Sequence, residues 1–194
     1  MKQSLAVYLI LLCIASAGCA TSPPVRLYVL NPTSSKADTR NQDLPILVHL
    51  QIHVPDYLDR PQIVVRQGEN RLSLAELDRW AEPLSRMLPR VLSQELANST
   101  LPLQVAPSSS AGTDYNIWIQ ILRLDGKPGG QVHLRALWRI RRGDSDRGLM
   151  RTHLFSRTAR VSGQGMEGLV QAHELLLDQL AGEVSRMVQA NQES

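Results

Sequence analysis

Apolar and polar residues alternate along several short segments of the chain, as they do in strands that bury only one face. The clearest case is residues 46–54, where every second residue is Ile, Val or Leu and most residues between them are polar. Shorter patterns of the same kind predict further strands at residues 26–30, 62–67 and 103–106. Alternation of this kind indicates a sheet that has one face in the core and the other in water.

A long hairpin is predicted in the second half of the chain. Residues 115–124 and 131–142 are its arms, and the sequence Asp-Gly-Lys-Pro-Gly-Gly at 125–130 is its turn. In the second arm, the residues expected to face the core are Val132, Leu134, Ala136, Trp138 and Ile140. Those expected to face outward are His133, Arg135, Leu137, Arg139 and Arg141. A third strand at residues 149–161 extends the meander.

Two segments carry apolar residues at intervals of three and four, which is the period of an amphipathic helix. The stronger pattern covers residues 166–189. The other follows Ser-Leu-Ala-Glu at 73–76, which has the spacing of a capping box, so we expect a helix over residues 73–98. Proline removes a backbone donor and obstructs the preceding turn. Because Pro83 and Pro89 lie inside this span, we expect a broken helix whose straighter part follows Pro83.

These elements predict one α+β domain over residues 26–190, with a mostly antiparallel sheet and two amphipathic helices packed on one face. The composition, 43% hydrophobic and 20% charged, is ordinary for a globular protein. A chain of this length can bury enough apolar surface to fold without disulfides.

The N-terminus has the composition of an export signal. A basic residue precedes an apolar run at residues 5–17, which is too short to span a bilayer as a helix. The run ends in Ser-Ala-Gly-Cys at 16–19, which resembles the lipobox of bacterial lipoproteins except for serine where leucine is commonest. We therefore expect a signal peptide at residues 1–18, a covalent lipid on Cys19 and a tether at residues 19–25. Ordinary signal cleavage just before Gly-Cys, which would leave Cys19 a plain thiol, is the alternative.

Export and lipidation determine the expected location and redox chemistry of the mature chain. Cys13, the other cysteine, leaves with the signal peptide, so no internal disulfide can form. Ala20 follows the lipidated cysteine, at a position where aspartate retains lipoproteins of enteric-type bacteria in the inner membrane. We therefore expect an outer-membrane lipoprotein that faces the periplasm.

Positive charge is concentrated in residues 115–160, which contain ten Lys or Arg and three acidic residues. An exported protein does not meet nucleic acid, so an acidic partner surface or anionic lipid headgroups are the candidate targets. Arg135, Arg139 and Arg141 form one row on the outward face of the hairpin, with Arg151 and Arg157 beside them if the meander pairs as expected. Alternatively, the arginines only keep a solvated strand face soluble.

The sequence contains none of the common catalytic motifs: no nucleophile elbow, no His-Glu-x-x-His, no phosphate-binding loop and no paired cysteines. His49 and His53 share a strand face but lie about 13 Å apart, too far to ligate one metal through that strand alone. His173, on the apolar side of the last helix, is interpreted as a hydrogen-bonded, partly buried histidine. We expect no enzymatic activity and no cofactor or metal besides the covalent lipid.

Two motifs carry a resemblance to a known family. One is Val-Pro-Asp-Tyr-Leu-Asp-Arg-Pro-Gln-Ile-Val-Val at 54–65, and the other is Leu-Asp-Arg-Trp-Ala-Glu-Pro-Leu at 77–84. With the early Tyr-Val-Leu at 28–30 and the closing amphipathic helix, they resemble the ABC-type transport auxiliary lipoproteins, the PqiC/YmbA-like family of small outer-membrane lipoproteins. The resemblance covers most of the mature chain.

The resemblance implies an accessory role in lipid transport between membranes. Members accompany MCE-domain proteins, which are anchored in the inner membrane and bridge the periplasm, so it implies docking to an MCE protein. A structural lipoprotein that scaffolds the envelope without lipid transport is the alternative, and a homo-oligomer is compatible with either. The partner-binding candidates are Tyr57, Leu58, Asp59, Arg60, Gln62, Arg135, Arg139 and Arg141. For Tyr57, Leu58 and Trp80, a purely structural role in the core is the other reading.

Overall fold

The structure, a computed structural model, describes residues 23–33, 46–99, 101, 103–106, 112–143 and 151–192. The expected signal peptide and Cys19 lie outside these ranges. No helix in the described ranges is long and apolar enough to cross a membrane.

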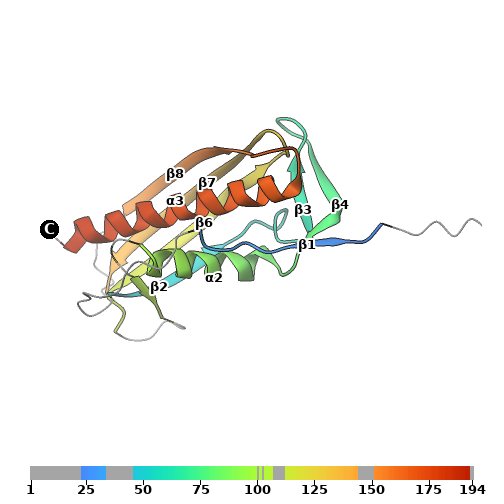
Figure 1. Cartoon of the computed structure of the whole chain (residues 1–194). Helices are drawn as coiled ribbons and strands as arrows, with labels where there is room; N and C mark the ends of the chain where they lie inside the picture. The colour runs from blue at the N-terminus through green and yellow to red at the C-terminus, as the bar shows by residue number, and fades with distance from the viewer. Residues whose placement is uncertain are drawn as a thin grey trace, which may run out of the picture.

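The described chain forms one eight-stranded mixed sheet with β6 at its centre (Figure 1). Its strands are β1 (Arg26–Tyr28), β2 (Ile46–His53), β3 (Gln62–Arg66), β4 (Leu72–Trp80), β5 (Leu103–Val105), β6 (Tyr115–Gly126), β7 (Gln131–Arg142) and β8 (Arg151–Arg160). Along one edge of β6 lie β7 and then β8, both in antiparallel pairs. Along its other edge, the first half of β6 pairs in parallel with β2, which pairs with β5. The end of β6 pairs with β3, and β4 and β1 follow outward from there.

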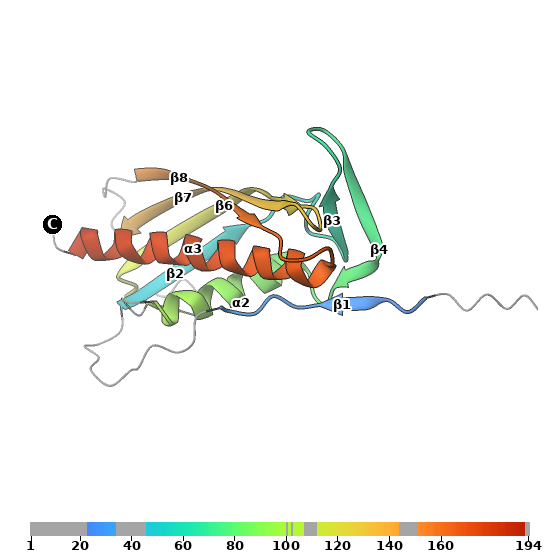
Figure 2. The same ribbon diagram turned by 45° about the horizontal axis from the view of Figure 1, so that its top comes forward.

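Two helices lie side by side on one face of this sheet (Figures 1 and 2). They are α2 (Leu84–Ala97) and α3 (Met166–Gln192). The core lies between the helices and the inward side chains of β6 and β7, including Ile117, Trp138 and Leu177. The expected single α+β domain with two helices on one face is therefore confirmed. The longest strand pairs, β6 with β7 and β7 with β8, are antiparallel as expected, and the parallel pairs around β2 make the sheet mixed.

Most predicted elements are confirmed within a few residues, but the expected helix start at residues 73–76 is wrong. These residues belong to β4, which pairs with both β3 and β1. The β3–β4 register jumps from Ile63 opposite Ala75 to Gln62 opposite Arg79, so β4 contains a bulge. The bulge shifts the side-chain alternation and gives the apolar residues a helix-like spacing. Trp80 does point into the core, but from a strand rather than from a helix.

Pro83 and Pro89 affect the helix differently. Pro83 lies directly before α2, where it breaks the chain direction between β4 and the helix, as expected. Pro89 lies inside α2, which continues through it to Ala97. The helical turns after Pro83 present the apolar face that was predicted, with Leu84, Leu88 and Leu92 buried.

The segment after β1 crosses the helical layer and holds both helices. The Leu30 side chain has no exposed surface. The backbone N–H of Asn31 donates to Glu174 of α3 at 2.8 Å, and that of Thr33 donates to Glu95 of α2 at 2.6 Å. In Figure 2 this segment runs beside α2. Residues 30–33 are thus an integral part of the fold.

Candidate functional site: the loop after β2 and the uncovered face of the sheet

The loop between β2 and β3 holds most of the residues of the first family-like motif, and two of its side chains point into the molecule. Leu58 is 2% exposed and belongs to the core. The hydroxyl of Tyr57 donates to Oδ2 of Asp125 at 3.2 Å. Burial, and then the negative charge of Asp125, raises the pKa of Tyr57 to about 12, so this hydroxyl remains protonated at physiological pH.

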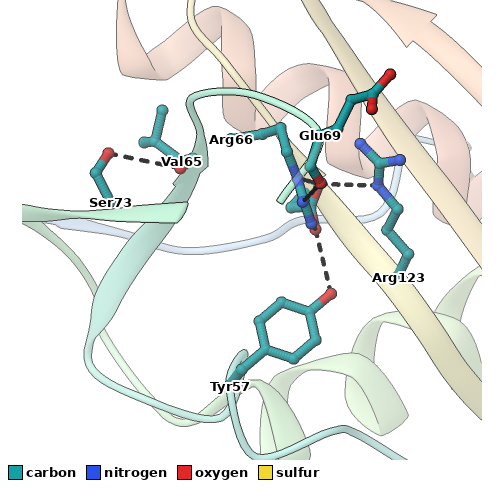
Figure 3. Close-up of polar contacts among 7 residues, drawn as sticks. Tyr57, Val65, Arg66, Glu69, Ser73 and Arg123 are labelled. Carbon is teal, nitrogen blue, oxygen red and sulfur yellow. Dashed lines mark hydrogen bonds and ion pairs between the residues drawn. The ribbon is translucent and has the colours of Figure 1, made fainter. Parts of the chain in front are cut away.

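Asp125 is the centre of a buried ionic cluster that includes Arg66, Arg123 and Tyr57 of this loop. Figure 3 labels these three partners. Its carboxylate has no exposed surface and accepts two hydrogen bonds from Arg66, at 2.9 and 2.6 Å. Nε of Arg123 donates to it at 2.9 Å. Burial alone would raise the pKa of Asp125, but the hydrogen bonds from Arg66 and Arg123 outweigh burial and lower it. The cluster therefore fixes the loop and β3 to the end of β6.

Asp59 is exposed, and its carboxylate caps a helix. The N-terminus of α2 has no cap from its own Pro83, but Oδ1 of Asp59 accepts a hydrogen bond from the backbone N–H of Ser85 at 2.9 Å. A carboxylate at this position satisfies a helical N–H group and interacts favourably with the helix dipole. Asp59 thus joins the loop to α2, whether or not it also contacts a partner protein.

The last two candidates of the loop are partly accessible. Arg60 is half-buried, and its Nε has no hydrogen-bond partner among the described residues. Gln62 begins β3 opposite Arg79 and is also half-buried. The structure thus gives Tyr57, Leu58 and Asp59 internal contacts, and a partner-binding role for the loop stays a prediction.

The arginine row lies on the face of the sheet that the two helices leave uncovered. Arg135 and Arg139 of β7 are exposed and Arg141 is half-buried, with Leu137 in the middle of the row. The guanidinium of Arg141 lies 5.2 Å from the ring centre of Trp118, a cation–π contact to the neighbouring strand. The register places Trp118 opposite Arg139 and Gln120 opposite Leu137.

A shallow hollow of about 600 Å³ opens on this face. Its lining comes from β2, β6 and β7: Gln51, Ile52, His53, Trp118, Ile119, Gln120, Leu137 and Arg139. Leu154 of β8 lies directly across from Leu137 and is 52% exposed, so the apolar surface continues onto the next strand. We call Trp118, Leu137, Leu154 and the three arginines the basic sheet face.

The basic sheet face contains no exposed carboxylate. Asp125 is the only acidic residue in β2, β6, β7 and β8, and it is buried. The expectation that Arg157 joins the row is wrong, because Arg157 lies 3.8 Å from Glu183 of α3, on the helix side of the sheet. Arg151 pairs with Ile140, and since side chains alternate it shares the parity of the inward residues.

Two features of the described residues bear on catalysis: possible metal ligands and the histidine of the last helix. They include no group of three or more His, Cys, Asp or Glu that could hold a metal ion. His173 is fully buried, its Nδ1 lies 2.7 Å from the carbonyl oxygen of Leu169, and burial lowers its pKa. This agrees with the interpretation of His173 as a hydrogen-bonded core histidine. Its ring meets Trp80 edge-on at 5.8 Å.

Sequence reasoning missed the ionic cluster and the hollow. Asp125 was placed in a turn, and nothing in the local sequence links it to Arg66, which is 59 residues away. Trp118 stands at an outward position of a strand, and a large aromatic side chain at such a position was a signal that could have indicated the hollow.

One family model and several solved structures are similar to this chain. A family model described as the ABC-type transport auxiliary lipoprotein component matches residues 28–185. A crystal structure of an uncharacterized protein has 19% identity and a TM-score of 0.71, covering 86% of this chain and 99% of that one. A Xanthomonas campestris protein of family DUF330 has 18% identity and a TM-score of 0.66, covering 87% and 100%. No curated protein matches the sequence. At these identities, the two solved structures show a shared fold.

Proposed function

This chain belongs to the family of ABC-type transport auxiliary lipoprotein components, and from that premise we propose that it is the outer-membrane docking subunit of an MCE-type lipid transport system. In this proposal, the chain is held in the outer membrane by lipid on Cys19 and acts by contact rather than by catalysis. Its partner is an MCE-domain protein that is anchored in the inner membrane and reaches across the periplasm.

The observation that carries the proposal is the basic sheet face. A sheet face left uncovered by helices, with Trp118 and two leucines beside three arginines, has the composition of a protein-binding surface. Aromatic and Arg side chains are enriched in interface cores, and charged residues around them steer the approach of a partner. Because no carboxylate is exposed on these strands, the complementary surface is acidic.

Binding between this lipoprotein and the MCE protein of the same bacterium tests the proposal. Arg135→Glu with Arg139→Glu should weaken binding by about tenfold or more, because it puts like charges opposite an acidic partner. Binding of the wild type should weaken as salt rises past about 0.15 M. Arg86→Glu with Arg186→Glu is the matched control, since it makes the same charge change on exposed residues of the two helices.

The loop is tested separately with Arg60→Ala, because replacing Asp59 would also remove the cap of α2. If only Arg60→Ala loses binding, and wild-type binding does not depend on salt, the arginines of β7 serve only to keep the sheet face soluble. Undiminished binding in both folded variants would reject both surfaces. If wild-type protein binds no MCE protein, a structural lipoprotein that scaffolds the envelope becomes the better description.

The anchor has its own test. Mass spectrometry of the mature N-terminus should find an acylated Cys19, and Cys19→Ala should release the protein from the membrane fraction. Firm anchoring is expected, because each buried CH₂ contributes about 0.8 kcal/mol and lipoproteins carry more than one acyl chain. A free thiol on Cys19 of the wild type would reject the anchor.

A further inference from the structure

Exposed apolar side chains are concentrated at one end of the molecule. Among the described residues, nine large apolar side chains are exposed, and six of these lie on β1, directly beside it, or on β4. These six are Val25, Leu27, Val29, Leu72, Leu74 and Leu77. Leu27 is the most exposed of all, at 65%. Exposed apolar side chains that gather on neighbouring strands mark a candidate interaction site.

Strand pairing puts these residues on one side of the sheet. β1 pairs in parallel with β4, Leu27 lies opposite Arg79, and extending this register brings Val25 opposite Leu77. Leu72 and Leu74 are exposed while Ser73 and Ala75 between and after them are half-buried, so the two leucines point outward together. We call Val25, Leu27, Leu72, Leu74 and Leu77 the β1–β4 apolar edge.

This edge is held firmly although β1 is only three residues long. Arg26 donates to both carboxylate oxygens of Asp78, at 2.6 and 2.8 Å, and the hydroxyl of Tyr28 donates to the same carboxylate at 3.0 Å. Hydrogen bonds from Arg26 and Tyr28 outweigh burial and lower the pKa of Asp78, so the carboxylate is charged at neutral pH. The alternation of side chains then turns Leu27 to the opposite side, away from Asp78.

The edge is also the part of the domain nearest to the expected anchor. Only six residue steps separate Cys19 from Val25, and an extended chain of that length spans at most about 20 Å. In Figures 1 and 2, β1 and β4 lie at one end of the molecule and the C-terminal end of α3 lies at the other. An anchored domain therefore keeps this edge, and not its far end, close to the membrane surface.

We infer that the β1–β4 apolar edge inserts into the surface of the phospholipid bilayer that holds the lipid anchor, and so fixes the orientation of the domain. The inference rests on the anchor of the proposed function and adds a second membrane contact to it. A short tether gives the edge a high effective concentration at the membrane, so even a weak contact is occupied. Without the edge, the same tether would let the domain turn freely.

Charge composition favours apolar insertion over attraction to anionic lipid. Along β4 and its turn, Arg71 and Arg79 are balanced by Glu69 and Glu76, and the remaining charged residue, Asp78, is paired with Arg26. Opposite charges in equal number give little net attraction to an anionic surface. The contact should therefore be nearly independent of salt, unlike docking at the basic sheet face.

Fluorescence quenching by bromine on lipid acyl chains tests the contact in the anchored protein. We would reconstitute full mature lipoprotein into phosphatidylethanolamine–phosphatidylglycerol vesicles that contain brominated phospholipid. Leu27→Trp and, on the other strand, Leu74→Trp should add emission that the bromine quenches. Leu175→Trp, an exposed position on α3 (43%), is the matched control and should add emission that is not quenched. The native tryptophans provide the baseline.

A second arm removes the anchor. Cys19→Ala protein collected from the periplasm should bind the same vesicles weakly, and Leu27→Glu with Leu74→Glu should lower this binding roughly tenfold. Leu122→Glu with Leu175→Glu makes the same change at two exposed leucines outside both proposed surfaces and should leave vesicle binding unaltered.

The outcomes separate this inference from the proposed function. If the wild type floats with vesicles but neither new tryptophan is quenched, the anchor stands and the membrane contact is rejected. If the new tryptophans are unquenched and shifted to the blue in an oligomer, the edge joins two copies of the chain instead, which also rejects the membrane contact. If the wild type lacks the acyl chains, the anchor fails, and vesicle binding by the Cys19→Ala protein alone decides about the edge.

Discussion

Asp125 shows how a single buried charge organises the end of the sheet where the loop, β3 and β6 meet. Removing two charges from water costs several kcal/mol per ion, and close hydrogen bonds must offset this cost. Here the carboxylate receives two hydrogen bonds from Arg66, one from Arg123 and one from Tyr57. Losing the carboxylate charge would leave Arg66 of β3 and Arg123 of β6 without the acceptor that they share.

Asp125→Asn is therefore expected to lower the free energy of unfolding at pH 7 by about 3 kcal/mol, because it leaves the arginine charges uncompensated. We place the loss at the lower end of the usual range since the Arg66 and Arg123 side chains are 21% and 35% exposed. Tyr57→Phe is the milder control and should cost about 1 kcal/mol, since it removes one neutral donor. Urea denaturation followed by tryptophan fluorescence measures both.

The pH dependence of the same variant has a definite sign. The pKa of Asp125 is lowered by folding, so its charge stabilises the native state above the unfolded pKa of about 3.9. This contribution is lost as the pH falls below that value, through the folded pKa. The difference between wild type and Asp125→Asn should therefore be full at neutral pH and shrink as the pH falls from 4 toward 2. An equal difference at every pH would contradict an ionised Asp125 in the native state.

The positions of some individual residues could be predicted from the sequence, whereas contacts between distant segments could not. The outward arginines and the inward Trp138 follow directly from alternation along β7, and the structure confirms both. The ionic cluster could not be predicted, because its members come from β3 and β6 and the register between them is set by tertiary contacts. The helix cap from Asp59 is similar: Ser85, its partner, is 26 residues further along the chain.

At the scale of elements, strand bulges and close helix contacts are the features that a hydrophobic pattern does not reveal. β4 has apolar residues at helix-like intervals, yet its hydrogen bonds go to β3 and β1. Its exposed leucines lie on the outer side, which is unusual for a strand and consistent with the membrane contact inferred above. The hairpin β6–β7 and helix α3 were predictable because each is long enough for one period to repeat several times.

The two glycines of α3 provide a prediction about how this helix is seated. Gly168 lies near its start, where an added Cβ would fall 1.8 Å from the carbonyl oxygen of Ser162. Gly182 lies in the same helix with nothing within 4 Å of an added Cβ. Gly168→Ala should destabilise the protein by about 1–3 kcal/mol, because backbone must move to admit the methyl group. Gly182→Ala should stabilise it by about 0.5–1 kcal/mol, because alanine is the better helix former.

Thermal unfolding of the two glycine variants against wild type is the measurement. The same chemical change then has opposite effects in one helix. Equal shifts in Tm for both variants would mean that α3 does not approach Ser162 as closely as the structure has it.

At the scale of the whole molecule, the two proposed surfaces lie in different places and respond to different conditions. The basic sheet face extends along β6, β7 and β8, whereas the β1–β4 apolar edge lies at one end of the domain. An edge seated in the membrane would leave the sheet face accessible from the periplasm. High salt should then weaken partner docking without detaching the domain from the bilayer.

This arrangement predicts how far each end of the domain lies from the membrane. α3 has 27 residues and spans about 40 Å, and it runs from the end near β3 and β4 toward the opposite end of the molecule (Figure 1). A fluorophore on Asn70→Cys, in the β3–β4 turn, should transfer energy efficiently to an acceptor on the lipid headgroups. One on Gln192→Cys, the last residue of α3, should transfer weakly.

Raising the salt concentration should change neither transfer efficiency, because the contact of the edge with the membrane is apolar. Leu27→Glu with Leu74→Glu should bring the two efficiencies closer together, because a domain held only by its tether samples many orientations. Equal efficiencies in the wild type would mean that the anchored domain turns freely, and docking would then have to fix its orientation instead.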